Sequence, residues 1–105
     1  MTYQEAQQLH ARARNKGIGK KLAKATYLRK VGDNFVIRYH FTDVVTITPE
    51  NEYILNSGGW YTKTTKDRMV TYAPVNVYQK QYQWFVGVTP FRDFIKVDRY
   101  GIPKT

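Results

Sequence analysis

Apolar and polar residues alternate with a period of two along most of the chain from Thr26 onward. This pattern predicts half-buried β-strands, because successive side chains of a strand point to opposite faces. In the second predicted strand, Phe35 and Ile37 are expected on one face, with Arg38 and His40 on the other. The predicted strands cover residues 26–31, 35–41, 44–48, 53–56, 75–80, 82–88 and 94–98.

Turn-forming residues separate these strands. Gly32-Asp33-Asn34 joins the first two, Pro49-Glu50-Asn51 follows the third, and Lys80-Gln81 lies at the centre of a hairpin. Gly, Asn and Asp tolerate the backbone angles of tight turns, and Pro fixes one of those angles. Residues 99–105 are expected to form a flexible tail.

The first fifteen residues change to a helical period. Ala6, Leu9 and Ala13 share a narrow apolar stripe, and Thr2 with Glu5 fits a capping box. A helix is therefore predicted from residue 3 to about residue 15.

A second, short helix is predicted at residues 65–72. Thr64 and Asp67 form another hydroxyl–carboxylate capping pair, and Pro74 stops the helix because it cannot continue the hydrogen-bond ladder. Residues 20–25 carry a weaker pattern, which is compatible with a short helical turn or with an ordered loop.

These elements predict an α+β fold. We expect a single antiparallel β-sheet of about five to seven strands, with an N-terminal helix and a short helix inserted after the fourth strand. A chain of 105 residues fits one domain. Within it, residues 1–25 are expected to form a basic helical segment, residues 26–98 the α+β core, and residues 99–105 the tail.

Positive charge is concentrated near the N-terminus. The formal net charge is +9, from 17 Lys and Arg against 8 Asp and Glu. No acid lies between Arg12 and Lys30, so this block creates a directional field. Its basic residues are Arg12, Arg14, Lys16, Lys20, Lys21, Lys24, Arg29 and Lys30.

Several classes of protein are disfavoured by what the chain lacks. There is no cysteine, which excludes disulfides and thiolate zinc sites. No apolar run is long enough to span a bilayer, and the N-terminus does not read as a signal peptide. We therefore expect a cytoplasmic protein without a membrane partner, located in the host cell if the protein is encoded by a phage.

Catalytic chemistry is poorly supported by the sequence. His40 and Asp43 are close enough in the sequence to suggest a pair for acid–base catalysis, but in a regular strand their side chains would point to opposite faces. His10 is the other histidine, and two histidines with scattered acids are a weak basis for a metal site. We expect no enzymatic activity, no cofactor and no bound metal.

The basic block favours nucleic acid as the partner, because dense Lys and Arg gain free energy by releasing phosphate counterions. The alternative is a merely solvated face. Gly17 and Gly19 would let backbone N–H groups approach a phosphate closely. The predicted DNA- or RNA-binding residues are Arg12, Arg14, Lys16, Lys20, Lys21, Lys24, Arg29, Lys30, Arg38, Lys63, Lys66 and Arg68.

Two further features suggest contacts with bases or phosphates. Arg38, His40, Tyr78 and Lys80 would offer stacking beside phosphate ligands if they shared an outward face, although strand tyrosines often simply pack. The Ser57-Gly58-Gly59-Trp60 stretch predicts a tight turn with a core tryptophan before a capped helix. An anion site at that helix N-terminus is the alternative.

The motifs between Thr26 and about Val86 resemble a family of small bacteriophage and mobile-element proteins. The most specific parts are an Asn-Ser-Gly-Gly-Trp run at 56–60 and a Thr-Thr-Lys-Asp-Arg run at 64–68. Where such proteins have a Gly-containing turn after the histidine, this chain has Phe41-Thr42. The resemblance implies a phage-type origin and a shared fold.

Two kinds of partner follow from these features. DNA or RNA leads. A host protein or ribonucleoprotein is the alternative, in which the chain would act as a non-enzymatic inhibitor for host takeover or counter-defence, as anti-CRISPR-like proteins do. An acidic protein surface would satisfy the same cations, so the choice between these partners stays open here, as does the oligomeric state.

Overall fold

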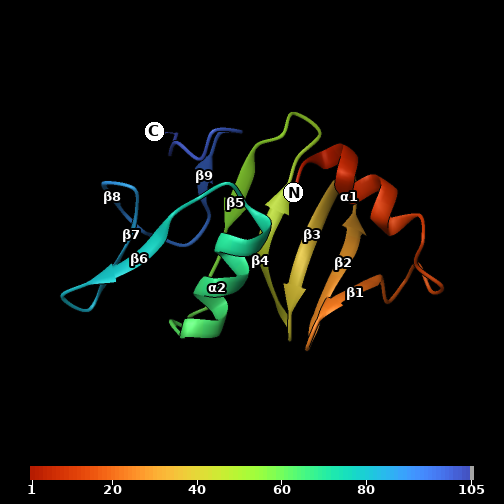
Figure 1. Cartoon of the computed structure of the whole chain (residues 1–105), viewed down its shortest axis with the longest axis horizontal. Helices are drawn as coiled ribbons and strands as arrows, with labels where there is room; N and C mark the ends of the chain where they lie inside the picture. The colour runs from red at the N-terminus through yellow and green to blue at the C-terminus, as the bar shows by residue number, and fades with distance from the viewer. Residues whose placement is uncertain (105) are drawn as a thin grey trace.

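The computed structural model describes residues 1–104, which form two helices packed against one face of a larger sheet and a smaller sheet beside it (Figure 1). The larger sheet has the order β1 (Lys20–Ala23), β2 (Thr26–Val31), β3 (Asn34–Tyr39), β4 (Thr42–Ile47), β5 (Tyr53–Leu55) and β9 (Ile95–Val97). The smaller sheet contains β6 (Val77–Lys80), β7 (Gln83–Val86) and β8 (Thr89–Pro90). The helices are α1 (Tyr3–His10) and α2 (Lys63–Tyr72).

The α+β class, both helices and the antiparallel pairing are confirmed, but the prediction of a single sheet is wrong. The β6–β7 hairpin forms as predicted, yet its free edge is paired with β8. The hairpin therefore reaches the larger sheet through side chains and not through backbone hydrogen bonds.

A row of five residues explains why the larger sheet has one apolar face. Leu28, Ile37, Val45, Leu55 and Ile95 lie directly opposite one another on successive strands. Each is 0 to 1% exposed. Burying side chains of this size stabilises the fold by about 1.5–3 kcal/mol each.

The strict alternation predicted for these strands is broken in two places. The register shifts between Ile37 and Arg38, which leaves Val44 as an extra residue beside Val45, and both valines are fully buried. Such a bulge puts two neighbouring side chains on nearly the same side. Val36 is also buried, at 3% exposed, although it belongs to the face opposite Ile37.

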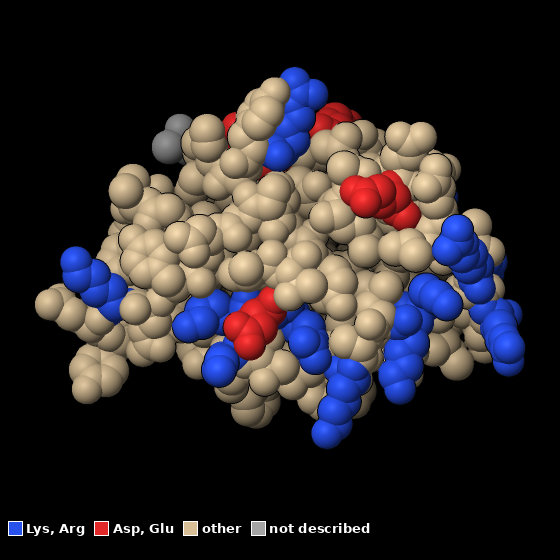
Figure 2. All heavy atoms as spheres, viewed as in Figure 1, with Lys and Arg blue, Asp and Glu red and all other residues tan. Residues whose placement is uncertain are grey.

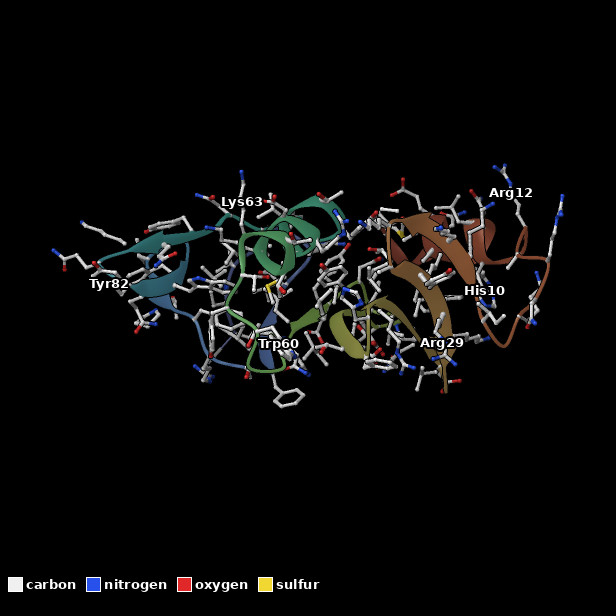
Figure 3. The ribbon with its side chains drawn as sticks, turned by 90° about the horizontal axis from the view of Figure 1, so that it is seen from below. His10, Arg12, Arg29, Trp60, Lys63 and Tyr82 are labelled. Carbon is white, nitrogen blue, oxygen red and sulfur yellow. The ribbon has the colours of Figure 1, made fainter. Side chains whose placement is uncertain are left out.

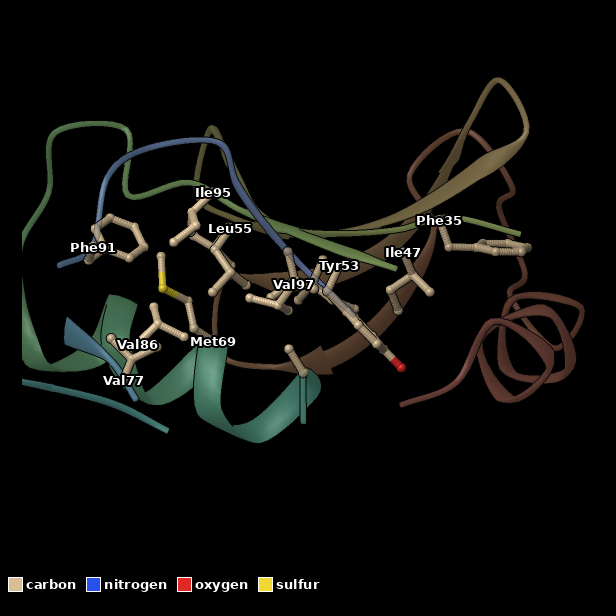
Figure 4. Packing of buried hydrophobic residues seen from close by; sticks show 14 of the residues in the cluster. Phe35, Ile47, Tyr53, Leu55, Met69, Val77, Val86, Phe91, Ile95 and Val97 are labelled. Carbon is tan, nitrogen blue, oxygen red and sulfur yellow. The ribbon is translucent and has the colours of Figure 1, made fainter. Parts of the chain in front are cut away.

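The apolar core extends across both sheets. Met69 of α2 is fully buried and lies close to Phe91 and Leu55, while Val77 and Val86 of the smaller sheet point toward it (Figure 4). The helix therefore links the two sheets through one continuous cluster.

The first helix is shorter than predicted and ends at His10, not near residue 15. Its capping box is confirmed, because Thr2 and Glu5 exchange side-chain and backbone hydrogen bonds. After His10 the chain tightens into two shorter turns. The ammonium group of Lys16 donates to the carbonyl oxygens of His10, Ala11 and Ala13 at 2.6–3.0 Å. These hydrogen bonds take the place of the backbone N–H donors that a longer helix would have offered to these carbonyls.

The segment at residues 20–25 is neither a helical turn nor a loop. Residues 20–23 form the edge strand β1, and Lys20 and Lys21 lie opposite Leu28 and Tyr27. Pairing with β2 outweighs the weak strand preference of these residues. Lysines suit an exposed edge because they discourage pairing with another chain.

The second helix begins two residues earlier than predicted. Its N-cap is Thr62, whose hydroxyl accepts a hydrogen bond from the Thr65 N–H at 3.2 Å, so the predicted cap Thr64 lies inside the first turn. Ala73, with an extended backbone, ends the helix before Pro74.

The C-terminal tail, expected to be flexible, is hydrogen-bonded up to Lys104. Val97 forms a β-bridge with Pro103, and the Lys104 N–H donates to the Lys96 carbonyl at 2.8 Å. The Lys104 ammonium also pairs with Glu52. Thr105, the last residue of the predicted tail, lies outside the described residues. No helix within residues 1–104 is long and apolar enough to cross a membrane.

Candidate nucleic-acid interface

The hairpin topology brings several segments to one end of the larger sheet. Thr26, Tyr39 and Thr42 lie in register there, and the His40 N–H donates to the Ala25 carbonyl at 2.9 Å. The loop that follows β5 and the start of α2 lie at the same end (Figure 1). We call this region, made of residues 24–25, 40–41 and 57–68, the turn end.

Three cations of α2 belong to the turn end. The Nε of Arg68 donates to the Thr26 hydroxyl at 2.9 Å, and its guanidinium lies 5.5 Å from the centre of the Tyr39 ring. Lys63 is exposed, and Lys66 approaches Trp84 at 6.0 Å. Among residues 1–104, none of these cations lies within 4.0 Å of an acidic oxygen.

Arg68 links α2 to the backbone of the β1–β2 turn. Thr26, which accepts from Arg68, in turn donates to the carbonyl oxygen of Lys24 at 2.8 Å. Lys24 is exposed in that turn. Figure 2 shows the resulting succession of Lys and Arg side chains along the lower edge of the molecule. Asp67 is the acid of the turn end.

The predicted N-terminal block does not form one surface. Lys21 and Arg29 project from the face of the larger sheet opposite Lys20 and Lys30, because neighbouring strand residues point to opposite sides. Arg12, in the loop after α1, and Arg29 lie toward the opposite side of the molecule from Lys63 (Figure 3).

Four of the predicted binding cations donate hydrogen bonds within the protein. Arg68 donates to Thr26, and the Nη2 of Arg29 donates to the Gly17 carbonyl at 2.9 Å. Lys16 donates to the three carbonyls at the end of α1. Arg38 pairs with Asp43, with Nε and Oδ1 2.8 Å apart and each side chain about one-third exposed. Arg14 is exposed in the same loop as Lys16. These contacts reduce the charge that Lys16 and Arg38 offer to a ligand.

The predicted stacking surface on the sheet does not exist as one face. Arg38 lies in β3 of the larger sheet, whereas Tyr78 and Lys80 lie in β6 of the smaller one. The Tyr78 ring stacks on Phe85 at 5.7 Å, and its hydroxyl donates to the Gly87 carbonyl. The sequence could not show this separation, because it carries no information on which sheet receives a strand.

A pocket of about 380 Å³ opens at the turn end. Its floor is formed by Val44, Ser57 and Thr65, which are 0 to 1% exposed. Tyr39 and Thr42 form part of its wall. The pocket therefore lies between the larger sheet, the loop after β5 and the first turn of α2.

Exposed aromatic side chains surround the mouth of this pocket. Phe41 is 97% exposed and Trp60 is 67% exposed, and both line the pocket together with His40 and Thr62. The His40 ring packs on Tyr39 with the two ring centres 4.4 Å apart. Because exposed apolar side chains that gather around a hollow mark binding sites, the mouth is a candidate binding surface.

The prediction that Trp60 belongs to the core is wrong. The Ser57 N–H and hydroxyl both donate to Asp93, at 2.8 and 2.7 Å, and the Trp60 N–H donates to the Ser57 carbonyl. Gly58 and Gly59 adopt positive φ angles of 63° and 85°, which turn the chain sharply. The turn thereby directs Trp60 outward. The Gly-Gly pair before Trp60 is the sequence signal that could have suggested this.

Sequence reasoning also missed Phe41. The sequence analysis places Phe41 at the end of the expected strand 35–41, but His40 has a positive φ of 54° and the β3–β4 turn begins there. Phe41 consequently lies at the tip of a hairpin. Within residues 1–104, no three His, Asp or Glu side chains gather closely enough to hold a metal ion.

The sequence profile of the Kyanoviridae Gp96 protein family matches residues 1–100. No curated protein and no solved structure shows a significant match to the chain. The match extends over both helices, both sheets and every segment of the turn end. It confirms the resemblance to small phage proteins, and the chain belongs to the Kyanoviridae Gp96 protein family, a family of phage proteins.

Proposed function

We propose that this phage protein binds nucleic acid through the turn end, in the cytoplasm of the infected host. Lys63, Lys66, Arg68 and Lys24 contact phosphates of the DNA or RNA backbone. The observation that carries the proposal is the Arg68–Thr26–Lys24 chain of hydrogen bonds, which ends on the Lys24 backbone carbonyl and holds α2 against the β1–β2 turn.

The physical basis is electrostatic. Cations of α2 without an acidic partner among residues 1–104 keep their charge available to an anion. A polyanion that neutralises them releases condensed counterions, and this release favours binding at low salt. With four phosphate contacts, the logarithm of the binding constant should fall with the logarithm of salt concentration with a slope of about −3 to −4.

Other residues predicted to bind nucleic acid contribute less to the binding energy in this proposal. Arg12 and Arg14 are exposed and add long-range attraction. Lys16 and Arg38 contribute less, because the Lys16 ammonium donates to three carbonyl oxygens and the Arg38 guanidinium is paired with the Asp43 carboxylate. Lys30 approaches the Phe35 ring at 5.8 Å, at the other end of the β2–β3 hairpin from the turn end.

Fluorescence anisotropy with labelled single- and double-stranded oligonucleotides tests the proposal. The charge-reversed variant Lys63→Glu/Lys66→Glu is compared with Arg12→Glu/Arg14→Glu, which changes the net charge by the same amount. We expect the first variant to lose at least tenfold in affinity and the second to lose clearly less. Equal losses would mean that net charge alone drives binding. Absence of binding by the unaltered protein at low salt would end the proposal.

A specific feature favours a second candidate function, inhibition of a host protein by docking. Tyr82 is 98% exposed and Val88 is 94% exposed in the smaller sheet, which projects from the rest of the molecule (Figures 1 and 3). Tyrosine is common among residues that dominate protein interfaces. Affinity capture from host lysate with Tyr82→Ser as control tests this candidate. Loss of one stoichiometric host protein from the Tyr82→Ser capture would support it, and an unchanged capture would contradict it.

A further inference from the structure

We propose that the pocket at the turn end receives one unpaired nucleobase, so that the protein binds single-stranded nucleic acid in preference to duplex. This inference rests on the proposed function and deepens it. In this proposal the Lys and Arg side chains of the turn end bind the phosphates, and the pocket binds the base.

The dimensions and lining of the pocket suit a planar aromatic ligand. A volume of about 380 Å³ lies within the range of roughly 300–1,000 Å³ that is typical of ligand pockets. Phe41 reaches the mouth from the β3–β4 turn and Trp60 from the loop after β5, so two separate elements supply aromatic surface. Tyr39 adds a third ring to the wall.

Stacking on aromatic side chains is how proteins hold single strands without reading their sequence. In a duplex, the bases are already paired and stacked, and removing one costs a few kcal/mol before any contact with the protein forms. Pockets that need a free base therefore discriminate against duplex. The hydroxyls of Thr62 and Thr65 lie 3.0 Å apart, and one donates to the other. Stacking on the aromatic rings is therefore the main interaction in this proposal.

The cations of the turn end stand where the flanking phosphates of such a base would lie. Arg68 packs over Tyr39, which is part of the pocket wall, and Lys63 directly follows Thr62 at the mouth. The first turn of α2 contains no acidic residue, so its N-terminal dipole is not offset there. This adjacency of apolar rings and positive charge matches the chemistry of a nucleotide and argues against a purely apolar ligand.

The first experiment compares three oligonucleotides of equal phosphate number by anisotropy: a thymidine single strand, the same strand with abasic sites throughout, and a duplex. We expect the abasic strand and the duplex to bind about tenfold more weakly than the intact strand. A ribonucleotide strand in a parallel arm ranks RNA against DNA, because the stacking mechanism applies to both.

The second experiment uses the side chains. Phe41→Ala and Trp60→Ala should each weaken binding of the intact strand severalfold and leave binding of the abasic strand unchanged. Both residues are exposed, so their removal should spare the fold, which circular dichroism checks. Tyr82→Ala is the matched control, since Tyr82 is an exposed aromatic residue that does not line this pocket.

The outcomes separate the two proposals. Equal affinity for intact and abasic strands, with no effect of Trp60→Ala, would overturn the base pocket and leave phosphate binding standing. Failure to bind any oligonucleotide would overturn the proposed function and this inference with it. Loss of intact-strand affinity in Tyr82→Ala equal to that in Trp60→Ala would contradict the assignment to this pocket.

Discussion

At the scale of single residues, Lys16 and Trp60 have roles that their chemical types do not suggest. The ammonium group of Lys16 is turned back onto the carbonyl oxygens at the end of α1. Trp60, the kind of residue usually found in a core, is two-thirds exposed at the mouth of a pocket. In both cases the local backbone decides the role, because it determines where the side chain can reach.

Replacement of Lys16 by Met tests its structural role. Lys16→Met should lower the free energy of unfolding by about 1 kcal/mol, because a cation at a helix C-terminus contributes up to that amount. Arg14→Met is the matched control and should change it by less than about 0.5 kcal/mol, since Arg14 is exposed. Urea denaturation monitored by circular dichroism measures both. Equal stabilities of the two variants would show that the Lys16 contacts contribute nothing in solution.

At the scale of elements, α2 both packs in the core and supplies cations to the turn end. Met69 on its buried side packs in the core, whereas Lys63, Lys66 and Arg68 belong to the turn end. The position of the pocket wall therefore depends on where this helix begins. Thr62, the N-cap, also lines the pocket.

The N-cap of α2 can be tested by comparing the stability effects of replacing Thr62 and Thr64 by alanine. Thr62→Ala removes the acceptor for the Thr65 N–H and should destabilise the protein by about 1 kcal/mol. Thr64→Ala, at the position that the sequence pattern favours as the cap, should be neutral or slightly stabilising because Ala is the better helix former. Thermal unfolding of the two variants measures the difference. The reverse order would place the start of the helix at Thr64.

At the scale of the whole molecule, the two ends of the strands differ in their balance of charge. The turn end has Lys24, Lys63, Lys66 and Arg68 with Asp67, whereas at the opposite end Asp33, Glu50 and Glu52 lie near Lys30, Lys96 and Lys104. A net charge of +9 on 105 residues, partly crowded at one end, creates repulsion that a bound polyanion or dissolved salt relieves.

Salt should consequently stabilise the fold while it weakens nucleic-acid binding. Raising NaCl from about 20 to about 300 mM shortens the screening length from roughly 20 to 6 Å, and we expect the Tm to rise by a few degrees. Lys63→Glu/Lys66→Glu should show a smaller rise because its repulsion is already reduced. Calorimetry at both salt concentrations measures the effect. A Tm that falls with salt in the unaltered protein would contradict this account.

The sequence by itself determined the α+β class, the β2 strand to the residue, the apolar face of the larger sheet and the excess of positive charge. These features follow from periodicity and composition, which are local properties of the chain. The resemblance to phage proteins rests on short runs of residues, and Ser57, Trp60 and Thr65 of these runs line the pocket in the folded chain.

The tertiary structure alone decided which residues meet. Lys20 and Lys21 became part of a strand because β2 offered a partner, and the β6–β7 hairpin formed a separate sheet with β8, which pairs with β7. The block of like charge was divided because strand neighbours point to opposite faces. Phe41 and Trp60, nineteen positions apart in the chain, came to share one pocket because the two turns that carry them lie at the same end of the sheet. Long-range pairing of this kind depends on the whole fold, which no short stretch of sequence contains.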